Sequence, residues 1–500
     1  MYDAVIFTDM TFFRQSSMHL GPFKVAHMLR KQGFEVLVVN HLSNYSTDEL
    51  KELIDVAISP QTKFVGFSTT FMAPVNEDKK SWKMPKDTPF PQGREFGDQI
   101  FEYILSKNNQ IKFAIGGRGG YGSENPYMNY WVKGYAENSI VHLMNHLCYG
   151  TDIPKSEVLD TGVVLINDPK AIGYDFSQDT MLWKKTDVVN HKVLPLETAR
   201  GCIFNCKFCN FILNGKKTND YIRQHSSIYD ELLSNYENYG ISHYYFADDT
   251  LNESTVKLEM LVEVVNQLPF KPQFWAFTRL ELLCTDPAKI DLMDKIGIRA
   301  MYFGVETMHM EAGRVVGKGY SREKQIEVIT QIKQNYPHIS LHGSFIAGLP
   351  KEPYDSIVLT LDQLKTNDIP LDSWSMRPLF IEQFDGGDPT TYSEFDLNYE
   401  KYGYNVLGIS PEGVVLWEND QGLKFVDLLG DIQKKLDDSK KTKHYYVPGI
   451  DAFQLVNVGY DLSSVLSSNL YGFDWNEADI RLDNFITEYK AQILELVKNG

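Results

Sequence analysis

The sequence predicts an α/β protein with two consecutive parallel-sheet units, a doubly wound sheet and then a partial β/α barrel, followed by a mostly helical C-terminal segment. Short apolar strands alternate with amphipathic helices along most of the 500 residues, and glycine-rich and cysteine-rich loops follow two of the strands. This length suggests two or three domains. We expect the boundaries to divide the chain into residues 1–150, 151–190, 191–385 and 386–500.

The first unit, residues 1–150, is expected to form a doubly wound parallel sheet. Its first helix carries Phe23, Ala26 and Leu29 at helical spacing and ends at Gly33, a residue that favours helix termination. Short strands separated by helices are typical of parallel sheets, because each crossover needs a helix. Strands are expected at 2–8, 34–40, 63–68 and 112–115, and helices at 21–33, 47–57 and 95–107.

A glycine-rich run from Gly116 to Gly120 follows the strand expected at 112–115. Ligands of doubly wound sheets bind at the carboxyl ends of the strands. Gly116 and Gly117 would allow the backbone to approach a large ligand closely, because glycine has no side chain. A turn with positive φ would need the same residues. Both roles are therefore compatible with this run.

Residues 151–190 are expected to form a connector with short strands, and residues 191–385 a series of six strand–helix units. Six units are too few for a complete eight-stranded barrel. In β/α barrels the residues at the carboxyl ends of the strands face the active site. Strands are expected at 194–198, 244–247, 273–278, 300–305, 340–346 and 373–379, and helices at 226–239, 254–267, 286–295, 322–336 and 354–366.

The last segment, residues 386–500, contains helical patterns at 422–435 and 479–498. We interpret it as a helical cap that closes the open side of the barrel and shapes the substrate pocket. Trp417 and Trp475 either line that pocket or pack in the core, and core packing is the more common role of tryptophan.

Cys202, Cys206 and Cys209 form a C-x3-C-x2-C motif directly after the first expected barrel strand. Iron–sulfur clusters are normally held by four thiolates. Three cysteines in one short loop therefore indicate a [4Fe-4S] cluster with one iron open to another ligand. The alternative is structural zinc, which needs four closed ligands. The remaining cysteines, Cys148 and Cys284, are far away in the sequence.

With Phe208 before its last cysteine, this motif resembles that of the radical S-adenosylmethionine (SAM) superfamily, in which the open iron binds the amine and carboxylate of SAM. The resemblance implies a partial (β/α)6 TIM-type barrel for residues 191–385. It also implies a flavodoxin/Rossmann-like, cobalamin-binding-like domain for residues 1–150, to which Gly116 and Gly117 would contribute. The cobalt-ligating motif Asp-x-His-x-x-Gly does not occur in the sequence. The sequence is compatible with a domain that binds cobalamin and with a domain of the same fold that does not.

The resemblance also implies SAM-binding roles for residues at successive strand ends. Asp248 and Asp249 follow the second barrel strand, where relatives contact the SAM amine; one of them could instead cap the following helix. Arg279 ends the third strand and could pair with the SAM carboxylate. An ordinary salt bridge between Arg279 and Glu281 is the alternative.

Two further positions come from the fourth and fifth barrel strands. Glu306 lies where relatives contact the ribose or the methionine part of SAM, and a carboxylate suits such donors. Gly348 lies in a segment that resembles the one along the adenine. Lys351 stands there where relatives usually have glycine. No further catalytic residue is assigned.

The implied reaction is reductive cleavage of SAM with an electron from a flavodoxin- or ferredoxin-like donor. The resulting 5′-deoxyadenosyl radical would abstract hydrogen from a small-molecule or peptide substrate. Cobalamin would point to methyl transfer to carbon or phosphorus, and its absence to oxidation, rearrangement or ring formation. RNA methylthiolation would need further cluster cysteines and a basic appendage, and neither is visible. A non-catalytic zinc protein is the alternative from a different class.

The composition and charge of the chain limit the kinds of molecule that we expect it to bind. The net charge of −17 opposes non-specific binding to nucleic acid, which depends on lysine and arginine. No apolar run reaches the ~18–20 residues needed to span a bilayer, and the first residues do not resemble a signal peptide. Five cysteines with three in one cluster argue against a disulfide framework. We expect a cytoplasmic protein without membrane or nucleic-acid partners.

Overall fold

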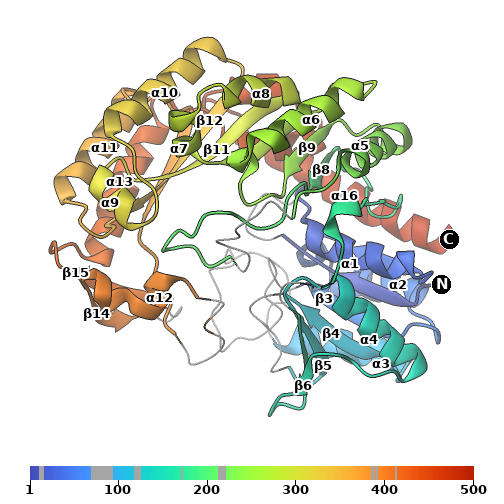
Figure 1. The fold of residues 1–500 in the computed structure, drawn as a ribbon. Helices are drawn as coiled ribbons and strands as arrows, with labels where there is room; N and C mark the ends of the chain where they lie inside the picture. Colours follow the sequence, from blue (N-terminus) through green and yellow to red (C-terminus); the bar gives the residue numbers. More distant parts are fainter. Residues whose placement is uncertain are drawn as a thin grey trace.

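The fold was analysed in a computed structural model. It describes residues 1–10, 16–68, 94–117, 125–168, 171, 173–211, 221–384, 389, 392–410 and 414–499. Two large parallel sheets with helices packed around them make up most of the chain (Figure 1). The predicted α/β class is confirmed.

The first sheet has seven strands in the order β2-β1-β3-β4-β5-β7-β6. All neighbouring pairs are parallel except β6 with β7, which is antiparallel. The two last strands of this order extend the sheet into the segment 151–190, which the sequence predicts as a connector. The strands are β1 (Ala4–Phe7), β2 (Val36–Val39), β3 (Phe64–Ser68), β4 (Lys112–Gly116), β5 (Met128–Lys133), β6 (Ser156–Val158) and β7 (Val164–Asn167).

Helices cover both faces of this sheet because its buried strands are apolar on both sides. Ala4 and Ile6 pack toward α1 (Leu20–Lys31) and α4 (Glu137–Tyr149). Val5 and Phe7 belong to the cluster on the opposite face. That face carries α2 (Thr47–Ala57), α3 (Arg94–Lys107) and the C-terminal helix α16 (Trp475–Asn499). In Figure 1 the red α16 lies beside the blue N-terminal domain.

The second sheet has six parallel strands that pair in sequence order from β8 to β13. Among the described residues β8 and β13 do not pair with each other, so the barrel is partial. The helix predicted at 286–295 begins only at Lys289, and a separate short helix that was not predicted precedes it, with Pro287 in the turn between them. The strands are β8 (Val193–Leu196), β9 (His243–Phe246), β10 (Gln273–Thr278), β11 (Ile298–Glu306), β12 (Ser340–Ala347) and β13 (Ser373–Pro378), and the helices are α5 (His225–Tyr239), α6 (Thr255–Gln267), α7 (Leu280–Thr285), α8 (Lys289–Ile296), α9 (Met310–Val315), α10 (Arg322–Asn335) and α11 (Tyr354–Thr366).

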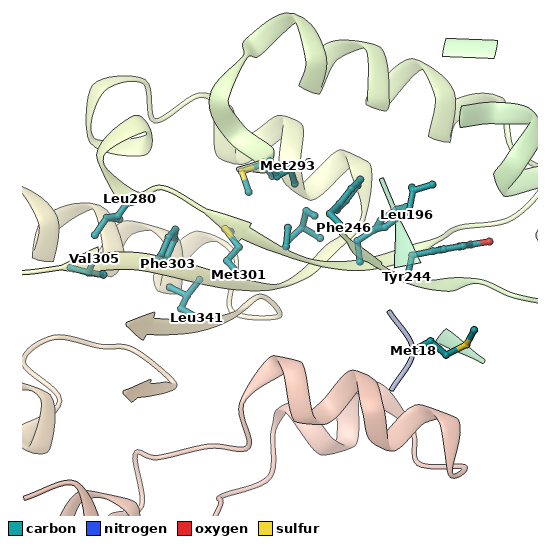
Figure 2. Packing of buried hydrophobic residues seen from close by; sticks show 14 of the residues in the cluster. Met18, Leu196, Tyr244, Phe246, Leu280, Met293, Met301, Phe303, Val305 and Leu341 are labelled. Carbon is teal, nitrogen blue, oxygen red and sulfur yellow. The ribbon is translucent and has the colours of Figure 1, made fainter. Parts of the chain in front are cut away.

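Alternate residues of the barrel strands face two different environments. Met301, Phe303 and Val305 of β11 lie in the same buried cluster as Leu341 of β12 and Met293 of α8 (Figure 2). The residues between them in the strand face the interior of the barrel. The core between strands and helices therefore fixes which side chains can reach the interior.

The C-terminal region packs against the barrel strands through α14. Gly449 at the start of α14 approaches β11 so closely that an added Cβ would lie 2.2 Å from Cβ of Ala300. Phe453 of α14 packs with Trp275 and Val193 of the barrel. The region is mostly helical and also contains an antiparallel hairpin. Its elements are α12 (Glu394–Asn398), β14 (Tyr404–Ile409), β15 (Val415–Asn419), α13 (Phe425–Lys440), α14 (Gly449–Asn457) and α15 (Leu462–Leu466).

Membrane-spanning helices were also sought. No helix in the described part of the chain has the length and the apolar composition needed to cross a bilayer.

Candidate active site

A buried carboxylate fixes the start of the cysteine loop. Asp248, after β9, accepts hydrogen bonds from the backbone N–H and hydroxyl of Thr198, both at 2.6 Å, and from the N–H of Ala199 at 3.0 Å. The Nζ of Lys257 lies 3.3 Å from the same carboxylate and neutralises its charge. Asp248 therefore holds the chain that leads into the loop. It does not line the cavity of the cysteines.

Backbone hydrogen bonds hold the cysteine loop, both within it and to its surroundings. Within the loop, the N–H of Cys209 donates to the carbonyl of Cys206 at 3.0 Å. Lys207 N–H donates to the carbonyl of Val316 at 3.3 Å, and Phe395 N–H donates to the carbonyl of Lys207 at 3.1 Å. The loop thus lies between the segment after α9 and the start of α12. These hydrogen bonds fix the position of the loop backbone.

The three cysteines line one cavity of about 200 Å³. Most of the residues predicted for SAM and cluster binding in the barrel surround it: Cys202, Cys206, Cys209, Phe208, Asp249, Arg279 and Glu306. Across the described residues no group of three or more His, Cys, Asp or Glu side chains converges as the ligands of one ion would. In a [4Fe-4S] cluster each thiolate binds a different iron, so the three sulfur atoms need not converge on one point. Three cysteines placed around a cavity therefore fit a cluster.

Arg279 connects the cavity to the cysteine loop. One of its Nη atoms donates to Sγ of Cys206 at 3.1 Å, and the other donates to Oε1 of Glu281 at 2.8 Å. The guanidinium also lies 3.8 Å from the ring centre of Phe204. Burial alone would lower the pKa of Arg279, but Glu281 and Cys206 raise it, and the net pKa is raised. Arg279 therefore forms the salt bridge that was considered as the alternative, and it also lines the cavity, so its pairing with the SAM carboxylate stays a prediction.

Glu306 lies at the same cavity with backbone φ of +65°, a conformation that non-glycine residues rarely adopt. Its Oε1 accepts a hydrogen bond from Nζ of Lys318 at 3.1 Å. Lys318 also donates to the carbonyl of Gly304 and lies 3.8 Å from Glu281. Burial would lower the pKa of Lys318, but Glu306 and Glu281 raise it. Sequence reasoning missed this lysine because it follows a short helix rather than a strand.

Gly348 is placed away from this cavity. Its φ is +78°, and an added Cβ would lie 2.6 Å from Cη2 of Trp417. The Nε1 of Trp417 donates to the carbonyl of Leu379 at 2.8 Å, and Tyr404 OH donates to the carbonyl of Gly348 at 2.7 Å. Gly348 thus allows the β14–β15 hairpin to pack against the barrel, and Trp417 has the expected core role.

A second cavity in the barrel, of about 480 Å³, lies at the carboxyl ends of β12 and β13 and shares wall residues with the cavity of the cysteines, here called the cluster cavity. The shared residues are Phe208, Phe277, Tyr302, Glu306 and Ser344. Because these residues border both volumes, a molecule in the second barrel cavity would lie next to one in the cluster cavity. Sequence analysis did not identify the other residues of the second barrel cavity, because the side of a strand that faces the interior depends on register.

A third cavity, of about 300 Å³, lies at the carboxyl edge of the first sheet. Gly116 and Gly117 line it, as predicted from their position after a strand. An added Cβ at Gly116 would have no atom within 4 Å, whereas Gly117 has φ of +137°. Gly117 therefore has the positive φ of the turn alternative, while a ligand-binding role for Gly116 stays a prediction. No histidine is among the described residues that line this cavity.

The opposite wall of this third cavity belongs to the barrel. Glu197, Arg200 and Ala247 contribute to it from the ends of the first two barrel strands. Arg200 lies 2.8 Å from Glu137 of α4 and also donates to both carboxylate oxygens of Glu197 at 2.9 and 2.8 Å. This buried network joins the first domain to the chain two residues before Cys202.

Comparison with known proteins places the barrel in a family. Residues 196–364 match the model of the radical SAM superfamily. The chain is 30% identical over 177 residues to the uncharacterized methyltransferase PH0819 of Pyrococcus horikoshii, covering 34% of this chain and 36% of that protein. It is 23% identical over 302 residues to the anaerobic magnesium-protoporphyrin IX monomethyl ester cyclase of Cereibacter sphaeroides, covering 55% of this chain and 47% of that protein. The matches thus span less than half of these relatives.

Among solved structures, the fold resembles the radical SAM methyltransferase TsrM of Kitasatospora setae, solved with cobalamin and a [4Fe-4S] cluster. The TM-score is 0.61 at 16% identity, and the similarity covers 98% of this chain and all of that one. At this identity the likeness shows the fold, which includes the N-terminal domain, the barrel and the C-terminal region. Residues 196–364 therefore carry a radical SAM domain, and the chain as a whole shares the fold of TsrM.

Proposed function

We propose that the protein is a radical SAM enzyme that cleaves SAM in the barrel and, with cobalamin in the cavity of the first sheet, transfers a methyl group to its substrate. Cys202, Cys206 and Cys209 would hold the [4Fe-4S] cluster. When bound, the cluster and SAM supply the electron and the radical source, and cobalamin supplies a methyl carrier. The similarity to PH0819 and to TsrM supports this reaction class.

One observation carries the proposal. The chain after β9 borders two cavities, because Ala247 lines the cavity of the first sheet and Asp249 lines that of the cysteines. Asp248 between them anchors the start of the cysteine loop. Ligands of the two cavities would therefore lie on opposite sides of one short segment. Group transfer between two cofactors needs this kind of proximity.

The side chains of the cluster cavity suit the polar end of SAM. The carboxylate of Asp249 can accept from an ammonium, while the buried cations of Arg279 and Lys318 can attract a carboxylate. Phe208, Phe211 and Phe277 add apolar surface to the same wall. Apolar rings limit the access of water, which would otherwise quench reactive intermediates.

A reaction without methyl transfer is the second candidate. The match to the anaerobic ester cyclase covers 55% of this chain, a larger share than the match to PH0819. Oxidation, rearrangement or ring formation would use the same barrel without cobalamin. A zinc-binding protein without catalysis is the third candidate, and it requires zinc in place of iron. We infer a flavodoxin- or ferredoxin-like electron donor and a cytoplasmic location for either enzymatic function.

Metal analysis of protein made and purified without oxygen, in cells supplied with cobalamin, tests the proposal. We expect iron close to four and cobalt close to one per chain, as one [4Fe-4S] cluster and one cobalamin require. Gly116→Trp should remove cobalt and leave iron unchanged, because the new side chain would project into the first-sheet cavity. Iron without cobalt would favour the second candidate. Zinc without iron would contradict both enzymatic functions.

A further inference from the structure

An exposed arginine of the last barrel strand lines the second barrel cavity. Arg377 is the fifth residue of β13 and pairs in register with Ile346 of β12, and both residues line that cavity. Ser344, which borders the cluster cavity, pairs with Ser375 two residues earlier in the same strand. Because side chains two residues apart share one face of a strand, Arg377 lies on the interior face near the carboxyl end of the barrel.

The other charged groups of this wall are already paired. Glu306 accepts from Lys318. Asp396 accepts from the backbone N–H groups of Glu382 and Ser393 at 2.8 and 2.7 Å. Glu382 also has a partner of its own. Within the described residues, Arg377 is the single basic side chain of the wall, and it has neither a hydrogen bond nor an ion pair.

The rest of the wall is mainly apolar and aromatic. The rings of Phe277 and Tyr302 lie edge to face with centres 5.2 Å apart, and Tyr302 stacks on His342 at 4.4 Å. Burial lowers the pKa of His342 to about 3, so this ring is neutral near pH 7 and adds no second positive charge. Ile450 of α14 borders the same cavity from the C-terminal region. The cavity thus combines flat apolar surfaces with one cation.

We propose that Arg377 binds the anionic group, a carboxylate or a phosphate, of a small substrate whose flat apolar part packs against Phe277 and Tyr302. This assignment rests on the proposed function, because it places the substrate beside the SAM site. A guanidinium forms two parallel hydrogen bonds with either kind of anion. Arg377 does not border the cluster cavity, where Arg279 and Lys318 are the cations, so it is not positioned for the carboxylate of SAM.

Three small aromatic probes test this assignment: benzoate, phenylphosphonate and benzyl alcohol. Their affinities would be measured by isothermal titration or ligand-observed NMR on the full chain reconstituted without oxygen and saturated with SAM. The wild-type protein should bind both anions at millimolar concentration and more tightly than the neutral alcohol. Arg377→Gln should weaken both anions at least about tenfold, the effect of losing a charge-assisted pair. Arg377→Lys should weaken them less.

A matched control is Arg481→Gln, which removes a surface arginine of α16 that pairs with Glu477. This variant should bind all three probes as the wild type does. A difference between benzoate and phenylphosphonate in the wild type would indicate which anion the substrate carries. Unchanged anion affinity in Arg377→Gln, an equal loss in Arg481→Gln, or no binding of either anion to the wild type would overturn the assignment.

Formation of 5′-deoxyadenosine without substrate, measured on the same samples, separates this inference from the proposed function. Arg377→Gln should cleave SAM at the wild-type rate. A loss of cleavage in this variant alone would place Arg377 in the SAM site and overturn the assignment. No cleavage by the wild type would contradict the proposed function, while the probe affinities would still decide whether Arg377 binds anions.

Discussion

The guanidinium of Arg279 donates a hydrogen bond to Sγ of Cys206 across 3.1 Å. The two residues come from neighbouring parts of the barrel mouth, one from the end of β10 and one from the loop after β8. Glu281 and the ring of Phe204 hold the guanidinium in this position. A cation next to a cluster thiolate stabilises negative charge, so this contact bears on how easily the cluster accepts an electron.

Replacing Arg279 should therefore change the reduction potential of the cluster. In Arg279→Gln the thiolate loses a charged donor, and we expect a negative shift of roughly 60 mV, the one-electron equivalent of about 1.4 kcal/mol. A redox titration monitored by electron paramagnetic resonance measures it. Arg279→Lys keeps the charge and should shift less. Equal reduction potentials for the wild type, Arg279→Gln and Arg279→Lys would show that the contact between Arg279 and Cys206 does not affect the cluster.

The three clustered cysteines should be distinguishable from the two distant ones. Cys206→Ala should lose most of its iron and all formation of 5′-deoxyadenosine, because a cluster needs each of its thiolates. Cys148→Ala and Cys284→Ala should retain both, since neither residue borders the cluster cavity. Iron content and product chromatography provide the readouts. Dependence of either quantity on a distant cysteine would contradict the three-ligand assignment.

Gly348→Ala should destabilise the protein by about 2–4 kcal/mol, because it combines a left-handed backbone position with overpacking. The added methyl group would meet Trp417, since its Cβ would lie 2.6 Å from Cη2. Gly116→Ala is the matched control, because no atom lies within 4 Å of its added Cβ. Denaturant unfolding of both variants gives the comparison. If Gly348→Ala left the free energy of unfolding unchanged, the β14–β15 hairpin would accommodate the added methyl group with little loss of stability.

The buried pair between Glu137 and Arg200 should contribute to the attachment of the first domain to the barrel. Glu137→Gln removes one partner of Arg200, while Glu197 still compensates its charge, so we expect a loss of about 1–3 kcal/mol in unfolding free energy. Glu52→Gln is the control, since its pair with Lys498 is exposed and should contribute less than about 1 kcal/mol. Equal effects of the two substitutions would show that burial of the pair is unimportant.

Glu352 should make stability depend on pH. Burial raises its pKa from 4.5 to about 7, although hydrogen bonds from Thr307 and from the backbone of Gly348 and Leu349 oppose the shift. The folded protein then binds the proton more tightly than the unfolded chain. Stability from this group is full below pH 4.5 and is lost as pH rises through 7, by no more than about 3 kcal/mol.

The variant Glu352→Gln tests this dependence. Its melting temperature should fall less between pH 5 and pH 8 than that of the wild type, because glutamine does not titrate. Thermal unfolding at several pH values measures the difference. If the melting temperatures of both proteins changed equally with pH, the pH dependence would come from other groups.

Sequence patterns predicted the parts of the fold and site that depend on local order. The strand–helix alternation identified both sheets, and the cysteine spacing identified the loop that borders the cavity. Positions at strand ends brought Asp249, Arg279 and Glu306 to that cavity. The pattern could not tell which of Asp248 and Asp249 faces the cavity. Adjacent residues point in opposite directions, and only the fold shows which one anchors Thr198.

Other features depend on contacts that no local pattern reveals. Gly348 was predicted at the adenine, whereas the structure uses its missing side chain to admit Trp417 from a hairpin later in the chain. Lys318 reaches Glu306 from the segment after α9, and Arg377 faces the interior only because of the register of β13. These placements arise from tertiary packing, which spacing along the sequence does not encode.

The position of α16 has a consequence for how the protein folds during synthesis. Tyr489, Ile493 and Val497 of this helix complete an apolar cluster on the face of the first domain that carries Leu50 and Leu53. The ribosome makes that face before it makes the helix that covers it. The N-terminal domain therefore exposes apolar surface until α16 has been made, and it reaches its final stability only after that. Chaperone binding to nascent chains that lack the last helix would be the expected cellular sign of this delay.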